Sequence, residues 1–339
     1  MASSSAAVRL IEEAMNRRRF SAALGAVSLA SALRGPALAQ VWPERPIRLI
    51  VPFPPGGGTD VISRQLAERM AANTGWTIVV ENRAGAGGNI GLDAVAKAAP
   101  DGYTIGMGQA SNLAINPALY AKMPYDPLRD FAPISSIASQ GLVVVVSAKS
   151  TFLSLAALVA AAREKADGVS LAHAGNGTIG HLAGEMLSRQ AGVKILIVPY
   201  KGIAPAVTEL MGGQVDVLFG NPLAVMPLVT GGLLRPIAVS SARRLGALPE
   251  VPTVAESGFA GFDAVNWSGL VAPARTPDTV ISRLHAEATA ALRRPEMVER
   301  LALDGSESFP SSVAEFAAFM RIELAKWGAI VRDIGLRID

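Results

Sequence analysis

Short apolar runs that end in glycine-rich turns and lead into amphipathic segments recur along this chain. The first run, residues 46–53, ends in a turn rich in proline and glycine, and Ile62, Leu66 and Met70 then repeat at helical spacing. A second run over 77–81 ends in another glycine turn and precedes a further helical pattern. This alternation of strand, turn and helix is typical of an α/β fold with parallel sheets and right-handed crossovers.

A second set of strands and helices follows the first. The β-branched run 142–147 predicts a central strand or a crossing between two lobes. Later strands are predicted over 170–173, 195–199, 215–219 and 237–240, a return strand over 265–272, and C-terminal helices over 280–292 and 312–334. No low-complexity linker separates the two sets. We therefore expect two lobes joined by crossing strands, with residues 40–141 and 267–339 in lobe 1 and 142–266 in lobe 2.

The first 39 residues have the order of a secretory signal peptide. Arg17, Arg18 and Arg19 precede an apolar stretch over 20–33, and Ala37-Leu38-Ala39 supplies a small-residue cleavage site. The apolar stretch is short for a membrane span. Both the general secretion route and the twin-arginine route fit this leader, and residues 1–14 precede an alternative start at Met15. The expected location of the mature protein is the periplasm.

Charge and composition narrow the classes of partner. The chain of 339 residues has 31 basic and 28 acidic side chains, of which five basic and two acidic lie in residues 1–39, leaving 26 of each. A neutral body offers no electrostatic footprint for nucleic acid. The chain has no cysteine, which excludes disulfides, thiolate metal sites and cysteine nucleophiles.

Three glycine-rich turns, residues 54–60, 85–91 and 175–181, each join a predicted strand to a helix. Such turns expose backbone N–H groups at helix N-termini, where the partial positive charge favours an anion. Turns that converge at the C-terminal ends of parallel strands line the crevice in which α/β folds bind ligands. These turns can hold a carboxylate without an arginine; the alternatives are plain tight turns and, at 85–91, a weak match to a dinucleotide fingerprint.

Catalytic and metal-binding patterns find little support in the chain. Its histidines are His173, His181 and His285, and they stand in no spacing that indicates a metal site or a catalytic triad. No cofactor motif of the P-loop type occurs. The sequence therefore predicts no catalytic residue, no metal and no cofactor.

Ordered motifs along residues 43–339 resemble one known family. They include Pro52-Phe53-x-Pro55-Gly56-Gly57-x-Thr59-Asp60, Glu81-Asn82-Arg83-x-Gly85-Ala86-Gly87-Gly88, Pro100-Asp101-Gly102-Tyr103-Thr104, Val198-Pro199-Tyr200-Lys201-Gly202 and Trp267-x-Gly269. These motifs are similar to those of the substrate-binding proteins of tripartite tricarboxylate transporters, the Bug family. The resemblance implies a two-lobed periplasmic-binding-protein fold, type II-like, with hinge-crossing strands, whose lobes close on a small carboxylate.

The resemblance also implies a set of ligand-binding positions, matched motif by motif. The first lobe contributes Phe53, Pro55, Gly57, Gly58, Thr59, Asp60, Gly88, Asn89 and Ser111, and the second contributes Gly177, Thr178, His181, Tyr200, Lys201 and Asn221. Because Asn221 is uncharged, a ligand's amino group has one partner fewer there, which favours a plain organic or aromatic acid.

The expected function is that of a monomeric, extracytoplasmic, non-enzymatic binding protein that delivers a carboxylate to membrane components of a tripartite tricarboxylate transporter. Two alternatives stay open on the sequence. One is an orphan receptor or sensor subunit that passes the signal to a sensor kinase. The other is an exported enzyme acting on a carboxylic acid, for which His181 and Asp60 are the candidate bases.

Overall fold

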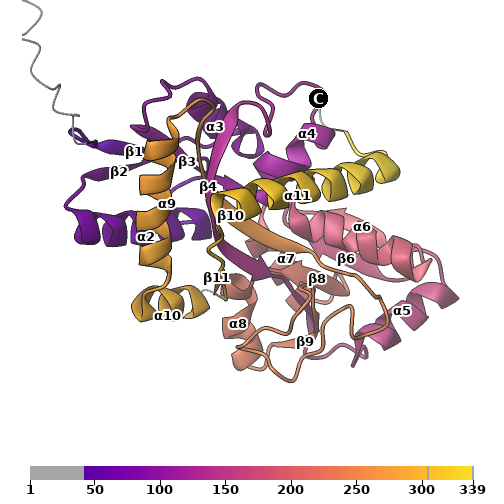
Figure 1. Cartoon of the computed structure of the whole chain (residues 1–339). Helices are drawn as coiled ribbons and strands as arrows, with labels where there is room; N and C mark the ends of the chain where they lie inside the picture. The colour runs from indigo at the N-terminus through magenta and orange to yellow at the C-terminus, as the bar shows by residue number, and fades with distance from the viewer. Residues whose placement is uncertain (1–41, 304, 338–339) are drawn as a thin grey trace, which may run out of the picture. The chain divides into compact units, whose positions relative to one another are not determined.

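The structure is a computed structural model that describes residues 42–303 and 305–337, so the predicted leader lies outside the described residues. Contacts between Cα atoms divide the chain after Glu44, and Arg45–Asp339 form one compact unit. The strands described in this unit form two sheets (Figure 1). One sheet draws its strands from both ends of the unit and the other from its middle.

The first sheet has the strand order β11-β4-β10-β3-β1-β2. Its strands are β1 (Ile47–Val51), β2 (Ile78–Asn82), β3 (Thr104–Gln109), β4 (Phe131–Gly141), β10 (Val265–Pro273) and β11 (Glu307–Ser308). Strand β1 pairs in parallel with β2 and β3, whereas β10 lies antiparallel between β3 and β4. All residues of β1 except Arg48 are buried, as expected for a strand covered on both faces.

The second sheet has the order β7-β6-β8-β5-β9. Its strands are β5 (Val143–Ser147), β6 (Ser170–His173), β7 (Leu196–Pro199), β8 (Val217–Gly220) and β9 (Leu234–Val239). Strand β6 runs parallel to β7 and β8, and β5 runs antiparallel to β8 and β9. The chain enters this sheet directly from β4 through Leu142 and leaves it after β9 toward β10.

The prediction of parallel sheets is therefore wrong for every pair that involves β4, β5, β9, β10 or β11, since these pairs are antiparallel. Strands β5 and β10 are antiparallel to their neighbours because the chain passes directly between the sheets there, without a helix that would return it in the same direction. The strands joined through helices, such as β1 to β2 and β6 to β7, are parallel as the pattern predicts.

Helices cover both sheets. They are α2 (Gly58–Thr74), α3 (Asn89–Ala96), α4 (Asn116–Leu119), α5 (Leu155–Glu164), α6 (Ile179–Ala191), α7 (Ile203–Met211), α8 (Pro222–Thr230), α9 (Asp278–Leu292), α10 (Pro295–Leu303) and α11 (Val313–Ile334), with short helical turns η1 (Ala86–Gly88) and η2 (Ser111–Ile115). Helix α9 packs on α2 and β4, and α11 contacts both β4 and α6. Figure 1 shows α11 extending from the first sheet's strands to α6.

The core is continuous between the two sheets. One cluster of buried apolar residues includes Ile50 of β1, Val144 of β5 and Leu171 of β6, together with Trp267 of β10 and Phe316 of α11. The 22-residue α11 begins with a capping box in which Ser312 and Glu315 satisfy each other's backbone N–H groups. The shared core fixes the β4–β5 and β9–β10 crossings beside the strand ends that carry polar side chains.

Within the described residues, no helix has the length and apolar character needed to cross a membrane.

Candidate ligand-binding site

Two adjoining cavities open between the turns of the first sheet and those of the second. The larger has a volume of about 620 Å³ and the smaller about 220 Å³. We call them the large and the small chamber. They share lining residues, which form the neck between them: Phe53, Gln109, Ala174, Ile203, Asn221 and Asn266. A volume of this size suits a small organic molecule.

The first sheet's contribution comes from the turn between β1 and α2 and from the end of β3. Phe53, Gly57, Gly58 and Thr59 line the large chamber. Gln109, the last residue of β3, donates from Nε2 to Thr59 Oγ1, and this bond fixes its amide against the start of α2. Helix α2 has no side-chain cap at Gly57, so its first N–H groups stay available to a ligand.

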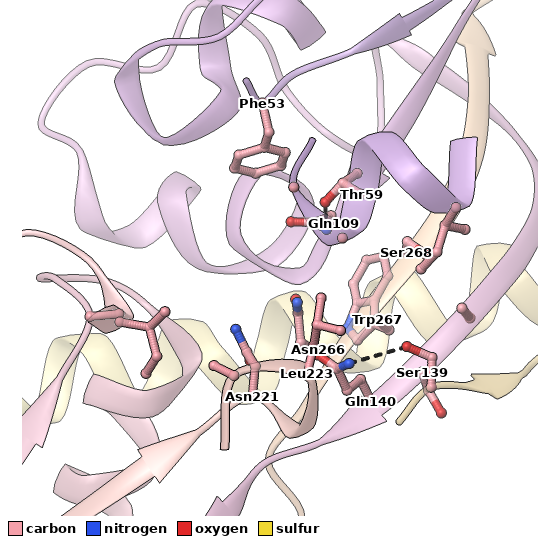
Figure 2. A pocket seen from close by; sticks show the side chains of 18 of the residues that line it. Phe53, Thr59, Gln109, Ser139, Gln140, Asn221, Leu223, Asn266, Trp267 and Ser268 are labelled. Atoms are coloured by element: carbon pink, nitrogen blue, oxygen red, sulfur yellow. Dashed lines mark hydrogen bonds between the residues drawn. The ribbon is translucent and has the colours of Figure 1, made fainter. Parts of the chain in front are cut away.

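The second sheet's contribution comes from three helix starts. Gly177, Thr178 and Ile179 line the small chamber at the start of α6, and Ile203 of α7 lines both chambers. Asn221 is the N-cap residue of α8, but its side chain makes no capping hydrogen bond. Figure 2 shows Asn221 on the opposite side of the space from Thr59 and Gln109. Its carboxamide therefore faces the site instead of closing its own helix.

Residues near the strand crossings complete the walls, and they are not among the site residues predicted from the sequence. They are Ser139 and Gln140 near the end of β4, Asn266, Trp267 and Ser268 of β10, and Leu223 and Ser306 beside them. The motif Trp267-x-Gly269 pointed to this strand but not to the side chains that flank the tryptophan. The predicted crossing between lobes is the sequence feature that indicates these residues, since polar residues at a hinge face the space between the lobes.

Charged side chains are absent from the lining that the described residues provide to either chamber. The positive potential comes instead from the N-termini of α2, α6, α7 and α8, each of which contributes lining residues. The N–H groups of Gly58 and Thr59 in α2, and of Ile179 and Gly180 in α6, donate to no described residue. Four uncapped or partly capped helix starts around an uncharged space favour an anion.

A serine in the wall of the large chamber has a buried hydroxyl without a partner. Ser268 is 4% exposed, and its Oγ has no hydrogen-bond partner among the described residues. The Oγ of Ser111, which lines the small chamber, is likewise buried and unpartnered. A buried polar atom that lacks a partner costs free energy. The wall of each chamber therefore contains a hydroxyl that no described residue satisfies.

The predicted ligand-binding residues fall into two groups. Those that line a chamber are Phe53, Gly57, Gly58, Thr59, Ser111, Gly177, Thr178 and Asn221. Those that lie outside the lining are Pro55, Asp60, Gly88, Asn89, His181, Tyr200 and Lys201. Within the second group, Asp60, Asn89 and His181 are buried and support the turns that line the chambers, whereas Pro55 and Lys201 are exposed. A direct contact between these residues and a ligand stays a prediction.

Asp60 holds the first glycine turn together. Its carboxylate accepts from the backbone N–H of Gly56 at 2.9 Å, from Arg64 Nε at 3.0 Å and from Asn82 Nδ2 at 2.9 Å. Burial raises the pKa of Asp60, but these hydrogen bonds and the Arg64 charge outweigh it, so the pKa lies below its usual value. The Asp60 carboxylate therefore stays ionised, but the positive charge of Arg64 offsets its negative charge. It adds little repulsion toward a bound anion.

Asn89 braces the second glycine turn in the same way. Its Oδ1 accepts from Asn116 Nδ2 at 2.7 Å and from the Tyr125 hydroxyl at 3.1 Å. The same hydroxyl donates to the carbonyl of Asn112 at 2.8 Å, and burial raises the pKa of Tyr125. This network connects the 85–89 turn to the 111–116 segment, of which Ser111 and Asn116 line the small chamber. Among the described residues, no group of three or more acidic or histidine side chains could hold a metal ion.

Comparison with known proteins gives a consistent set of relatives. Residues 62–336 match a family described as the tripartite tricarboxylate transporter family receptor. A UPF0065 protein from the tcbD–tcbE intergenic region of Pseudomonas sp. strain P51 is 38% identical over 96% of both chains. Protein BugT of Bordetella pertussis is 37% identical over 96% of this chain and all of its own.

Solved structures show the same similarity in three dimensions. The Rhodopseudomonas palustris protein Rpa4515, solved with adipate, has a TM-score of 0.78 and 34% identity, covering 88% of this chain and 100% of its own. The periplasmic binding protein BugD has a TM-score of 0.74 and 36% identity over the same shares. MatC of R. palustris, with bound malate, has a TM-score of 0.73 and 30% identity over 86% and 100%. These matches confirm the two-lobed periplasmic-binding-protein fold.

Proposed function

We propose that this chain captures a small carboxylate in the periplasm and presents it to the membrane components of a tripartite tricarboxylate transporter. The chain belongs to the receptor family of such transporters. Its relatives are solute-binding proteins and not enzymes, so the prediction of a non-enzymatic receptor is confirmed and the alternative of an exported enzyme is set aside. The predicted leader at residues 1–39 and the periplasmic location belong to this proposal.

The observation that carries the proposal is the uncharged cleft surrounded by helix N-termini. A carboxylate in such a space accepts hydrogen bonds from backbone N–H groups and from hydroxyl and carboxamide donors. Without a fixed basic side chain, the helix starts of α2, α6, α7 and α8 supply the favourable potential. The adipate in the Rpa4515 structure and the malate in the MatC structure support a carboxylate as the class of ligand.

We further propose the lobe boundaries and the ligand contacts on the same basis. Lobe 1 consists of residues 40–141 with 267–339, and lobe 2 of residues 142–266. The crossings after β4 and before β10 would act as the hinge, so that closure brings the α2 start toward the starts of α6 and α8. The predicted contacts are those site residues that line a chamber, together with the polar residues at the crossings.

A thermal-shift screen tests the proposed ligand class. Residues 40–339 are heated with adipate, malate, aromatic acids and amino acids, and each acid is paired with its neutral amide. A ligand present at 100 times its dissociation constant adds about 2.7 kcal/mol to the free energy of unfolding. We expect at least one acid to raise the melting temperature while its amide does not. Stabilisation by the amides as well as the acids, or by none of the acids, would contradict the proposal.

The substitution Ser268→Ala has two expected effects of opposite sign. Removal of the buried, unpartnered Oγ is expected to stabilise the ligand-free protein by about 1 kcal/mol, since that atom costs free energy where it stands. The affinity for the acid that the screen identifies is expected to fall about 5-fold, because one donor to the ligand is lost. Denaturant unfolding and calorimetric titration measure the two effects.

Ser257→Ala serves as the matched control, since the Ser257 hydroxyl donates to the Thr253 carbonyl at 2.8 Å. Its removal is expected to lower stability slightly and leave affinity unchanged. If Ser268→Ala lowered stability without a change in affinity, Ser268 would not face the ligand.

A further inference from the structure

Two buried histidines lie directly behind the loop that lines the small chamber. His173 is the last residue of β6, and His181 lies in the first turn of α6. Their rings stack with centroids 4.3 Å apart and an interplanar angle of 11°. The two residues are 1% and 5% exposed. The five residues between β6 and α6 therefore have the ligand cavity on one side and the imidazole pair on the other.

Backbone groups of this loop contact both imidazoles. The backbone N–H of Gly177 donates to His181 Nδ1 at 3.1 Å, and that of Gly175 approaches His173 Nδ1 at 3.2 Å. The carbonyl of Gly175 lies 2.9 Å from the same nitrogen of His173. An imidazole accepts a hydrogen bond at Nδ1 only when that nitrogen carries no proton. The bond from Gly177 therefore requires a neutral His181 with its proton on Nε2.

The loop held in this way forms much of the small chamber. Ala174, Asn176, Gly177 and Thr178 all line it. Thr178 also caps α6 by accepting from the backbone N–H of His181 at 3.3 Å. The position of the α6 start, with its available N–H groups, thus depends on contacts that the two histidines make.

We propose that His173 and His181 are positioning residues that keep the 174–178 loop in its ligand-binding conformation only while both imidazoles are neutral, so that acidification releases the loop and the bound carboxylate. The identity of the released ligand rests on the proposed function, whereas the effect of pH on the loop does not. A proton on His181 Nδ1 removes the acceptor of the Gly177 N–H. A proton on each ring places two like charges 4.3 Å apart in a buried space.

Few charged groups are near enough to stabilise protons on the two imidazoles. Glu185 of α6 lies 3.8 Å from His181 Nε2 and faces the pair from the next helical turn. The neighbouring strands β7 and β8 carry no titratable side chain. Farther along α6, Arg189 is paired with Asp333 of α11. His173 Nε2 has no hydrogen-bond partner among the described residues.

Burial, and to a smaller extent the charge of His181, lowers the pKa of His173 to about 4. In a released loop the imidazole is solvated and returns to a pKa near 6.5. The released state then binds the proton more tightly than the closed state does. The closed loop is fully favoured above pH 6.5 and loses that advantage as the pH falls from about 6.5 to about 4.

The test compares the dissociation constants of adipate and malate at pH 7.5 and pH 5.0 in the wild type and in variants. For each protein, the dissociation constant at pH 5.0 is divided by the one at pH 7.5. Protonation of the acids themselves affects all proteins equally, so it cancels when these quotients are compared between proteins. We expect the wild-type dissociation constant to rise by an additional factor of about 5 to 30 over that of His173→Asn, because His173 is the histidine whose pKa burial lowers. His181→Asn keeps an acceptor for the Gly177 N–H at Oδ1 and is expected to remove part of the same factor.

His285→Asn is the control, because His285 lies outside the site and its Nε2 is 2.9 Å from the carbonyl of Ser311. It should keep the wild-type pH ratio. An equal ratio in the wild type and in His173→Asn would overturn the proposal.

A second measurement needs no ligand and separates this proposal from the proposed function. Hydrogen exchange of the Gly175 and Gly177 amides, expressed as protection factors, is followed at the same two pH values. Protection is expected to fall at pH 5.0 in the wild type and to change little in His173→Asn. If neither acid binds at pH 7.5, the ligand assignment fails while the exchange data still decide the role of the histidines. Equal protection at both pH values would refute that role.

Discussion

The substitution Asn221→Asp is expected to weaken carboxylate binding by about 100-fold. It keeps the size of the side chain and replaces a neutral carboxamide at the neck of the two chambers with a negative charge. Two like charges about 4 Å apart in a partly buried site repel by roughly 4 kcal/mol at an effective dielectric constant near 20, of which solvent and side-chain relaxation would remove part. Because no basic side chain among the described lining residues could neutralise the new carboxylate, the loss is expected to be large.

Calorimetric titration with the acid found in the thermal-shift screen measures this effect. Asn73→Asp is the matched control, since it adds the same charge near the C-terminal end of α2, about 22 Å along that helix from its cleft-facing start. Asn73 accepts a hydrogen bond from Arg294, so the control is expected to keep the wild-type affinity. A loss of less than 3-fold for Asn221→Asp would mean that the ligand's charge does not lie near this residue.

The substitution Glu323→Leu is expected to lower the free energy of unfolding by about 3 kcal/mol. Glu323 of α11 is 3% exposed, and its Oε2 accepts from Nε1 of both Trp267 and Trp327 at 2.8 Å. Its Oε1 pairs with Lys326 at 2.5 Å. Loss of the carboxylate leaves two buried indole donors without an acceptor and a partly buried ammonium group without its ion pair.

Denaturant unfolding of the ligand-free protein measures this effect. Glu323→Gln keeps one acceptor oxygen and is expected to cost about 1 to 2 kcal/mol. Glu299→Leu, at an exposed position of α10, is the control and is expected to stay within about 0.5 kcal/mol of the wild type. Since Trp267 also lines the large chamber, a cost below 1 kcal/mol for Glu323→Leu would show that α11 does not fix the cleft wall through this carboxylate.

Most strands with a continuous apolar pattern could be located from the sequence. The first strand was predicted over 46–53 and is found over Ile47–Val51, and the strand predicted over 170–173 is found at those residues. These segments are buried among apolar neighbours on both faces, so their own residues carry the signal. The glycine turns after them were also predicted, because few other residues allow a strand to turn so directly into a helix.

Strand β4 shows what local pattern leaves undecided. Its residues Ser135 and Ser136 are buried although they are polar. The Ser135 hydroxyl donates to the carbonyl of Ser311 at 3.0 Å, and the Ser136 hydroxyl donates to the carbonyl of Phe309. These partners lie more than 170 residues away in the sequence. No local pattern therefore indicates that Ser135 and Ser136 are buried strand residues.

The sequence by itself determined the family, the α/β alternation and the turns that line the cleft, because glycine, proline and buried apolar runs act on their immediate neighbours. Only the tertiary structure decided which polar groups face the ligand space. His181 and Asp60 turn inward to support their loops, since each finds partners there. Gln140, Asn266 and Ser268 line the cleft because the β4–β5 and β9–β10 crossings bring distant strand ends together. Side-chain direction at a crossing depends on both sheets at once, and no single segment encodes it.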